Sequence, residues 1–183
     1  FGFIEVGGVT MHAQEGNPKP RMFRDDRSRS LINRMGFNND GSEAVAERIS
    51  KDLSKRGSLP CPLFVNLGKS KITPNEEALS DYATSMQRLH HVVDGFVVNV
   101  SSPNTPNLRD LQHESVLGDL LEGLAKVLSE LNATVEKPRP MLVKFAPDLD
   151  VATLLGMVDV ARGAGADGVV LSNTTVERGP AEH

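Results

Sequence analysis

Several short apolar runs in this sequence end in side chains that can hydrogen-bond a small molecule. Asn66 and Asn99 each close one run, Ser102 follows Asn99, Lys144 lies near the end of a third run, and a fourth leads into Ser172-Asn173-Thr174. Amide, hydroxyl and ammonium groups inside such runs are costly unless something satisfies them. They predict a site rich in amides and hydroxyls, with one cation and little acid. Such a site suits a neutral, planar, amide-bearing ligand or cofactor.

Other kinds of site lack the residues that they need. The single cysteine, Cys61, excludes an internal disulfide framework and a cysteine-rich zinc site. The predicted strand ends carry no His, Asp and Glu cluster for a metal, and no P-loop or GxGxxG motif is present. Cys61 precedes a strand, and we expect it to be buried as packing. His12, His90 and His91 are predicted to lie at the surface.

The overall composition is that of an ordinary globular protein that does not bind nucleic acid. Of 183 residues, 39% are apolar, and 20 basic against 24 acidic residues give a net charge of −4. This balance provides no basic surface for nucleic acid. No apolar run reaches the roughly 18 residues that cross a bilayer, and the chain does not open like a signal peptide.

The elements that must position these side chains alternate between two periods. Short apolar stretches rich in Val, Ile and Phe predict buried strands over residues 1–9, 63–67, 95–100, 141–145 and 168–171. Amphipathic stretches predict helices over residues 43–54, 76–90, 116–131 and 151–162.

This order predicts an α/β fold with parallel strands and right-handed crossovers. About five strands and four helices fit either part of a doubly wound sheet or five-eighths of a (β/α)8 TIM-type barrel, which usually needs about 250 residues. In both folds the polar strand ends share one edge, where ligands bind. Taken alone, an Asn there can bond neighbouring backbone, and Lys144 can pair with a carboxylate. Polar side chains at the same end of four successive predicted strands favour a binding site.

Six segments of the sequence resemble the motifs of one family, and they follow the same order along the chain. The segment Asn99–Arg109 resembles the active-site loop of dihydroorotate dehydrogenases. The other matching segments are Glu15–Arg24, Ile32–Asn38, Val65–Lys69, Val143–Asp148 and Ser172–Thr175. The resemblance covers nearly the whole chain. A serine at position 102 of this loop resembles the membrane-associated, quinone-using class of the family. The soluble classes resemble the same pattern with a cysteine at this position.

The resemblance implies an FMN-bearing barrel that oxidises dihydroorotate to orotate in pyrimidine synthesis. Residues 1–183 then look like the central part of a single barrel domain whose N-terminal and C-terminal parts are not in this sequence. An N-terminal region upstream is expected to associate with a membrane, the inner mitochondrial membrane in a eukaryote or the cytoplasmic membrane in a bacterium. Ubiquinone or another quinone is the implied final electron acceptor.

The resemblance also implies roles for individual residues. Ser102 matches the base that removes the C5 proton of the substrate, and Thr105 and Phe37 match its proton path. The substrate-binding set is Asn33, Arg34, Met35, Gly36, Phe37, Asn99, Asn104, Asn173 and Thr174. The FMN-contacting set is Gly8, Asn66, Asn99, Lys144 and Ser172, with Gly8 standing where the family usually has Ser or Thr. Arg21 and Arg24 match positions near a quinone tunnel.

Two other interpretations stay open. One is another FMN-barrel dihydropyrimidine oxidoreductase, although such relatives resemble this pattern with a Cys in the loop. The other is a catalytically inert barrel segment that serves as a binding or scaffold module. No metal is expected in any of these interpretations.

Overall fold

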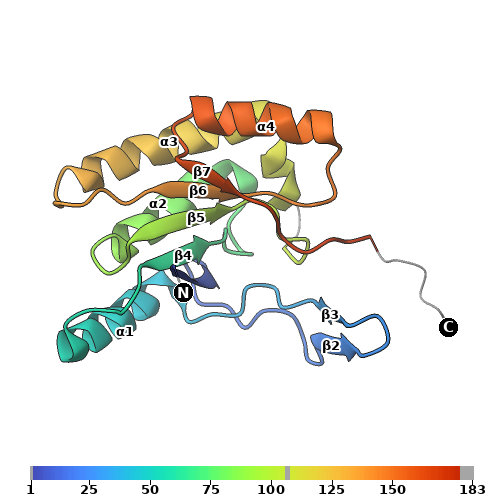
Figure 1. The fold of residues 1–183 in the computed structure, drawn as a ribbon, viewed down its shortest axis with the longest axis horizontal. Helices are drawn as coiled ribbons and strands as arrows, with labels where there is room; N and C mark the ends of the chain where they lie inside the picture. The colour runs from blue at the N-terminus through green and yellow to red at the C-terminus, as the bar shows by residue number, and fades with distance from the viewer. Residues whose placement is uncertain (1, 106–107, 178–183) are drawn as a thin grey trace.

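The central element is a parallel sheet of five strands, seen in a computed structural model that describes residues 2–105 and 108–177 (Figure 1). Pro106 and Asn107 of the predicted active-site loop lie outside the described residues. The strands are β1 (Ile4–Val9), β4 (Leu63–Leu67), β5 (Gly95–Asn99), β6 (Met141–Lys144) and β7 (Gly168–Val170). All five were predicted to within three residues at each end.

The order of the strands distinguishes between the two predicted architectures. Neighbouring strands follow chain order, β1-β4-β5-β6-β7, and each neighbouring pair is parallel. A doubly wound sheet reverses its order at a switch point, whereas a β/α barrel adds every strand on the same side. The described sheet is therefore an arc of a (β/α)8 barrel.

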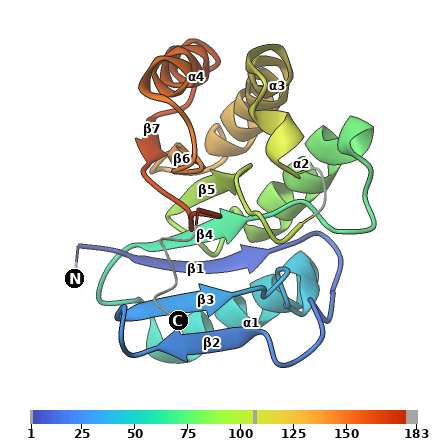
Figure 2. The same cartoon turned by 90° about the vertical axis from the view of Figure 1, so that its right-hand side faces the viewer.

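Within the described residues, four α-helices connect and cover the strands. They are α1 (Gly41–Arg56), α2 (Ala78–Leu89), α3 (Glu114–Asn132) and α4 (Val151–Gly163). Each helix packs against the next one in the chain, and Figures 1 and 2 both show α3 and α4 side by side on the same face of the sheet. A single helical layer is what a barrel requires. The predicted helix over residues 76–90 is divided, because a 3₁₀ turn, η1 (Asn75–Glu77), precedes α2.

Alternation along the strands separates the core from the site. Val65 and Leu67 of β4 and Phe96 and Val98 of β5 are buried in the core that includes the helix leucines. Because successive strand residues point to opposite faces, Asn66 and the other intervening residues face away from the helices. The polar residues are thus directed into the interior of the arc rather than into the packed layer.

Two elements escaped prediction because neither has a strong apolar period. One is an antiparallel hairpin of β2 (Met22–Asp25) and β3 (Ser30–Asn33), which lies at the end of the sheet toward which the strands point (Figure 1). Its apolar side chains Met22, Phe23 and Leu31 are exposed, so no buried face marks its pattern. The other is the 3₁₀ helix η2 (Leu108–Gln112).

Several predictions of burial were wrong. The strands predicted over residues 1–9 and 168–171 are partly exposed rather than buried, because β1 and β7 stand at the two ends of the described sheet and each pairs with one strand only. His90 is fully buried rather than at the surface, because it ends α2 against Phe96 of β5, with the two rings 6.4 Å apart. Cys61 is only partly buried, in the segment that leads into β4 at the edge of the sheet opposite the polar strand ends.

Candidate active site

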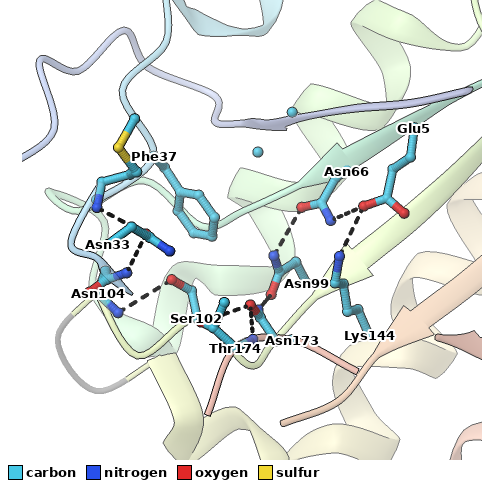
Figure 3. A pocket seen from close by; sticks show the side chains of 14 residues that line it. Glu5, Asn33, Phe37, Asn66, Asn99, Ser102, Asn104, Lys144, Asn173 and Thr174 are labelled. Atoms are coloured by element: carbon cyan, nitrogen blue, oxygen red, sulfur yellow. Dashed lines mark hydrogen bonds and ion pairs between the residues drawn. The ribbon is translucent and has the colours of Figure 1, made fainter. Parts of the chain in front are cut away.

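A cavity of about 210 Å³ opens at the carboxyl-terminal edge of the sheet, where the polar strand ends were predicted to meet (Figure 3). Segments that follow β3, β5 and β7 contribute to its wall, together with residues of the strands, β1 among them. Its lining consists of Glu5, Gly7, Gly8, Asn33, Met35, Gly36, Phe37, Asn66, Asn99, Ser102, Asn104, Lys144, Asn173 and Thr174. Twelve of these fourteen residues belong to the sets predicted from sequence.

One wall of the cavity is a chain of hydrogen bonds that crosses the sheet. Asn99 Nδ2 donates to Asn66 Oδ1 at 3.0 Å, and Asn66 Nδ2 donates to Glu5 Oε1 at 2.8 Å. Lys144 Nζ donates to the same carboxylate oxygen at 3.2 Å (Figure 3). Four strands therefore share one network. Glu5 was not among the predicted site residues, because its partners are remote in sequence. It is one carboxylate among fourteen lining residues, which agrees with the expectation of little acid.

The network continues to the segment after β7 through Asn173. Asn173 Nδ2 donates to Asn99 Oδ1 and to Ser101 Oγ, each at 3.1 Å. Ser101 Oγ in turn donates to the backbone oxygen of Lys144 at 2.6 Å. Ser101 is fully buried and joins three segments, although the sequence had singled out only its neighbour Ser102 as functional.

A second group of polar side chains surrounds Ser102 on the other side of the cavity. The backbone N–H of Asn104 donates to Ser102 Oγ at 3.3 Å, and Asn104 Nδ2 donates to Asn33 Oδ1 at 3.3 Å. Ser102 is 6% exposed, so its hydroxyl lies in a nearly dry wall. Asn33 ends β3, which means that the unpredicted hairpin positions one of the predicted substrate residues.

Phe37 projects between the two polar groups (Figure 3). Its backbone has a positive φ of 51°, which is uncommon for a residue with a side chain. The ring lies against two glycines, since a Cβ atom built on Gly8 or Gly68 would come within 2.5 Å of it. The Gly at position 8 therefore leaves room for this ring.

Three residues of the predicted catalytic, substrate-binding and FMN-contacting sets do not line the cavity. Arg34 turns outward, where its guanidinium donates twice to the backbone oxygen of Pro20, at 3.1 and 2.8 Å. Ser172 is exposed and donates to the backbone oxygen of Asn173 at 3.2 Å. Thr105 is buried behind the cavity wall, and within residues 2–105 and 108–177 its Oγ1 has no hydrogen-bond partner.

A second hollow, of about 580 Å³, lies at the base of the hairpin. It is lined by Lys19, Pro20, Arg21, Met22 and Met35. Met35 also lines the first cavity, so the two spaces share a wall. Of the two arginines predicted for a quinone site, Arg21 lines this hollow, whereas Arg24 is exposed on β2 and does not.

The loop after β4 is held by a buried polar cluster. Asp81 of α2 accepts hydrogen bonds from the backbone N–H of Ser70 and from the Thr73 hydroxyl, the latter at 2.6 Å. Lys69 Nζ donates to the backbone oxygens of Ser70 and Thr73. Burial lowers the pKa of Lys69, and the Asp81 carboxylate opposes that shift. The cluster therefore fixes the loop that begins at Gly68, the glycine that lies against the Phe37 ring.

Tyr82 supports the site from the helical layer. It is fully buried, and its hydroxyl donates to the backbone oxygen of Asn99 at 2.8 Å. Burial raises the pKa of Tyr82, so the phenol stays a neutral donor. The end of β5 is thus anchored from behind while the side chain of Asn99 faces the cavity.

In the part of the chain that the structure describes, no three His, Cys, Asp or Glu side chains are grouped so that they could hold a metal ion. Among the same residues, no helix is long and apolar enough to span a membrane.

Comparison with protein families identifies relatives along the whole sequence. A family model described as dihydroorotate dehydrogenase matches residues 1–182. A protein of Gloeobacter violaceus named dihydroorotate dehydrogenase (quinone) is 48% identical over 178 residues, which is 97% of this chain and 47% of that protein. One of the same name from Deinococcus radiodurans is 48% identical over 187 residues, covering 100% of this chain and 48% of its own. The chain spans about half the length of these curated relatives.

Solved structures give the same picture. The chain is similar to DHODH of Eimeria tenella in complex with ferulenol, with a TM-score of 0.88 and 36% identity, over 98% of this chain and 52% of that one. The ligand-free enzyme of the same organism matches with a TM-score of 0.86 and 35% identity, over 97% and 53%.

Proposed function

Because the chain belongs to the dihydroorotate dehydrogenase family, we propose that its cavity is the substrate site of an enzyme that oxidises (S)-dihydroorotate to orotate in pyrimidine synthesis. The proposed hydride acceptor is FMN, and the proposed final electron acceptor is a quinone. We also propose that residues 1–183 are the central part of a single FMN-binding barrel domain.

One observation supports this function above the others. A single cavity gathers the hydroxyl of Ser102 and the side-chain amides of Asn33, Asn99, Asn104 and Asn173, which come from three separate segments. Each amide offers one donor group and one acceptor, which matches the alternating N–H and C=O groups at the edge of a dihydropyrimidine ring. Two such amides stand on each side of the cavity, so a flat ring between them is held by its edges.

Ser102 is proposed as the general base that takes the C5 proton of dihydroorotate. A serine hydroxyl is a weak base, so its own proton must move on as the substrate proton arrives. The buried Thr105 hydroxyl, three residues later and without a partner among the described residues, provides a group for that transfer. Phe37 lines the same cavity and is proposed to flank this proton path.

The residues on the opposite wall fit a flavin. When bound, FMN supplies the hydride acceptor for C6 of the substrate. Lys144 is the cation of this wall, where it pairs with Glu5 beside the amides of Asn66 and Asn99, and its ammonium would help to hold the negative charge that develops on a reduced flavin ring. Asn66 and Asn99 present amide groups beside it. Ser172 and Gly8 are proposed to contact the cofactor from the flanking segments.

The hollow beside Arg21 is proposed as part of the quinone site. A quinone is a flat apolar ring with carbonyl groups, and the hollow combines methionines with one guanidinium donor. It shares Met35 with the substrate cavity, which brings the two reactants of the proposed cycle to one wall. Arg24, on β2 of the same hairpin, is proposed to lie at the outer rim of the quinone site. Because quinones dissolve in lipid, we place the protein at a membrane surface, mitochondrial in a eukaryote or cytoplasmic in a bacterium.

The test is a visible absorbance spectrum of the purified protein, repeated without oxygen after dihydroorotate is added. A flavin band that bleaches with dihydroorotate, and returns with an added quinone, supports cofactor, substrate and acceptor in one experiment. A band that dihydroorotate leaves unchanged would overturn the proposed reaction. A colourless protein would favour the inert-module interpretation.

A further inference from the structure

Arg109 lies outside the cavity, yet it contacts the backbone of two segments that form its wall. It belongs to η2, behind the loop that carries Ser102. Its Nε donates to the backbone oxygen of Ser101 at 3.1 Å. One of its terminal nitrogens donates to the backbone oxygen of Thr174 at 3.3 Å. A single guanidinium therefore joins the residue that precedes Ser102 to the residue that follows Asn173.

The remaining terminal nitrogen of Arg109 pairs with Asp148 at 3.0 Å. Asp148 lies in the segment after β6, and its side chain is 11% exposed. The same carboxylate accepts hydrogen bonds from the Thr175 hydroxyl and from the backbone N–H of Val176, the latter at 3.1 Å. The Thr175 hydrogen bond first, then those from Val176 and Arg109, lower the pKa of Asp148. The pair therefore stays charged near neutral pH.

The segments after β5, β6 and β7 are joined at this pair. Ser101 and Asn173 also meet inside the cavity wall, where Ser101 Oγ accepts from Asn173 Nδ2 at 3.1 Å. Arg109 and Asp148 close the same junction from outside. A second link from η2 reinforces it, because Gln112 Oε1 accepts from the backbone N–H of Ala146 at 3.1 Å.

We propose that the Arg109–Asp148 pair is a positioning clamp, which sets the distance between the Ser102 base and the Asn173–Thr174 substrate contacts. The clamp touches neither substrate nor cofactor, and it acts through the backbone of Ser101 and Thr174. This inference rests on the function proposed above.

The geometry explains why the clamp needs an arginine. Its three nitrogens diverge in a fixed plane toward three different acceptors, two carbonyls and one carboxylate. The single ammonium of a lysine keeps the charge but does not reach three acceptors in three directions. The Arg109→Lys variant therefore preserves the ion pair with Asp148 and releases the two carbonyls.

The experiment compares Arg109→Lys with the unaltered flavin-loaded protein. We expect the rate of flavin reduction at saturating dihydroorotate to fall at least tenfold, since a misplacement of about 1 Å can cost about 100-fold. Orotate affinity should weaken only a few-fold, while flavin content and the unfolding temperature stay unchanged. Backbone hydrogen exchange over residues 172–177 should become faster. Arg162→Lys is the matched control, because the Arg162–Asp159 pair is exposed on α4.

An unchanged rate of flavin reduction in Arg109→Lys would overturn the clamp. So would a loss of rate that is fully accounted for by lost flavin or by a lower unfolding temperature, because that would be a merely structural role. Failure of the proposed function is seen separately, as an unaltered protein whose flavin dihydroorotate does not reduce. In that case hydrogen exchange over residues 172–177 still decides whether Arg109 holds this segment.

Discussion

The ammonium of Lys144 lies 3.2 Å from the carboxylate of Glu5, although the two residues are 139 positions apart in the chain. Glu5 stands on β1 and Lys144 ends β6, so the curvature of the sheet brings together two strands that are not neighbours. The pair balances one charge with another at the edge of the cavity. It also holds the cation toward the wall where the flavin is proposed to bind.

Replacement of Lys144 by alanine is expected to weaken FMN retention by about tenfold to 100-fold. A hydrogen bond from a charged donor contributes about 1.5–3 kcal/mol, and the change also leaves the Glu5 carboxylate unpaired beside an electron-rich ring. The measurement is the flavin-to-protein absorbance ratio after dialysis. Lys137→Ala, at an exposed position before β6, is the control. Equal flavin content in the two variants would remove Lys144 from the cofactor site.

Replacement of Ser102 by alanine is expected to lower the rate of flavin reduction by dihydroorotate by about 100-fold to 10,000-fold, the usual range for a positioned general base. FMN should be retained, because Ser102 lies with Asn104 and Asn33 rather than in the Glu5–Lys144 network. Single-turnover absorbance at the flavin band measures both quantities. Ser101→Ala is an informative companion, since its hydroxyl bonds the Lys144 backbone instead. An alanine variant with full activity would exclude Ser102 as the base.

The sequence predicted the layout of the sheet because buried parallel strands are marked by their own composition. The runs of β4, β5 and β6 are mostly buried, and β1 and β7, which are partly exposed at the two ends of the sheet, still contain valines, so the position of each strand could be read locally. The hairpin of β2 and β3 carries no such mark, since Met22, Phe23 and Leu31 are exposed. Local patterns also misjudged His90, which is polar and next to a helix end but is buried against β5.

Most residues of the site were predicted from the sequence, but the hydrogen bonds and ion pairs that join them were not. Asn66, Asn99 and Asn173 stand out as amides at strand ends, and motif resemblance added Asn33 and Phe37. Nothing in a linear pattern shows that Glu5 joins Lys144 across the arc, or that η2 reaches back to the segment after β7. Those contacts depend on the strand order and on loop geometry, which appear only when the chain is folded.

Replacement of Gly68 by alanine is expected to displace Phe37 and to weaken dihydroorotate binding by about tenfold. A Cβ atom on Gly68 would lie 2.5 Å from the Phe37 ring, and that ring is already held by a backbone with positive φ. A rigid aromatic ring confined in this way has to move into the cavity. The apparent Km for dihydroorotate and the orotate dissociation constant measure the effect.

Gly163→Ala is the matched control for that change. Gly163 ends α4 with no atom within 4 Å of an added Cβ and without a positive φ, so we expect normal binding and unchanged or slightly higher stability. Normal substrate affinity in Gly68→Ala would show that Phe37 tolerates the extra methyl group and does not shape the pocket.

The buried His90 is expected to make stability depend on pH. Burial is the main cause that lowers the pKa of His90 below its ordinary value of 6.5, and His91 and Arg139 add to the effect while the Asn132 hydrogen bond opposes it. Below about pH 6.5 the unfolded chain takes up a proton that the folded chain resists. The contribution of His90 is therefore fully present above that pH and is lost as the pH falls, by about 1.4 kcal/mol for each unit of pKa depression.

Urea unfolding between pH 7.5 and 5.5 measures this loss. In His90→Gln the decline in the free energy of unfolding toward low pH should be smaller than in the unaltered protein, because the titrating group is gone. His91→Gln, one residue along and exposed, should keep most of the decline, because His91 is only a minor cause of the shift. If His90→Gln retained the full slope, the pH dependence would have to arise from other groups, and the buried imidazole would have no part in it.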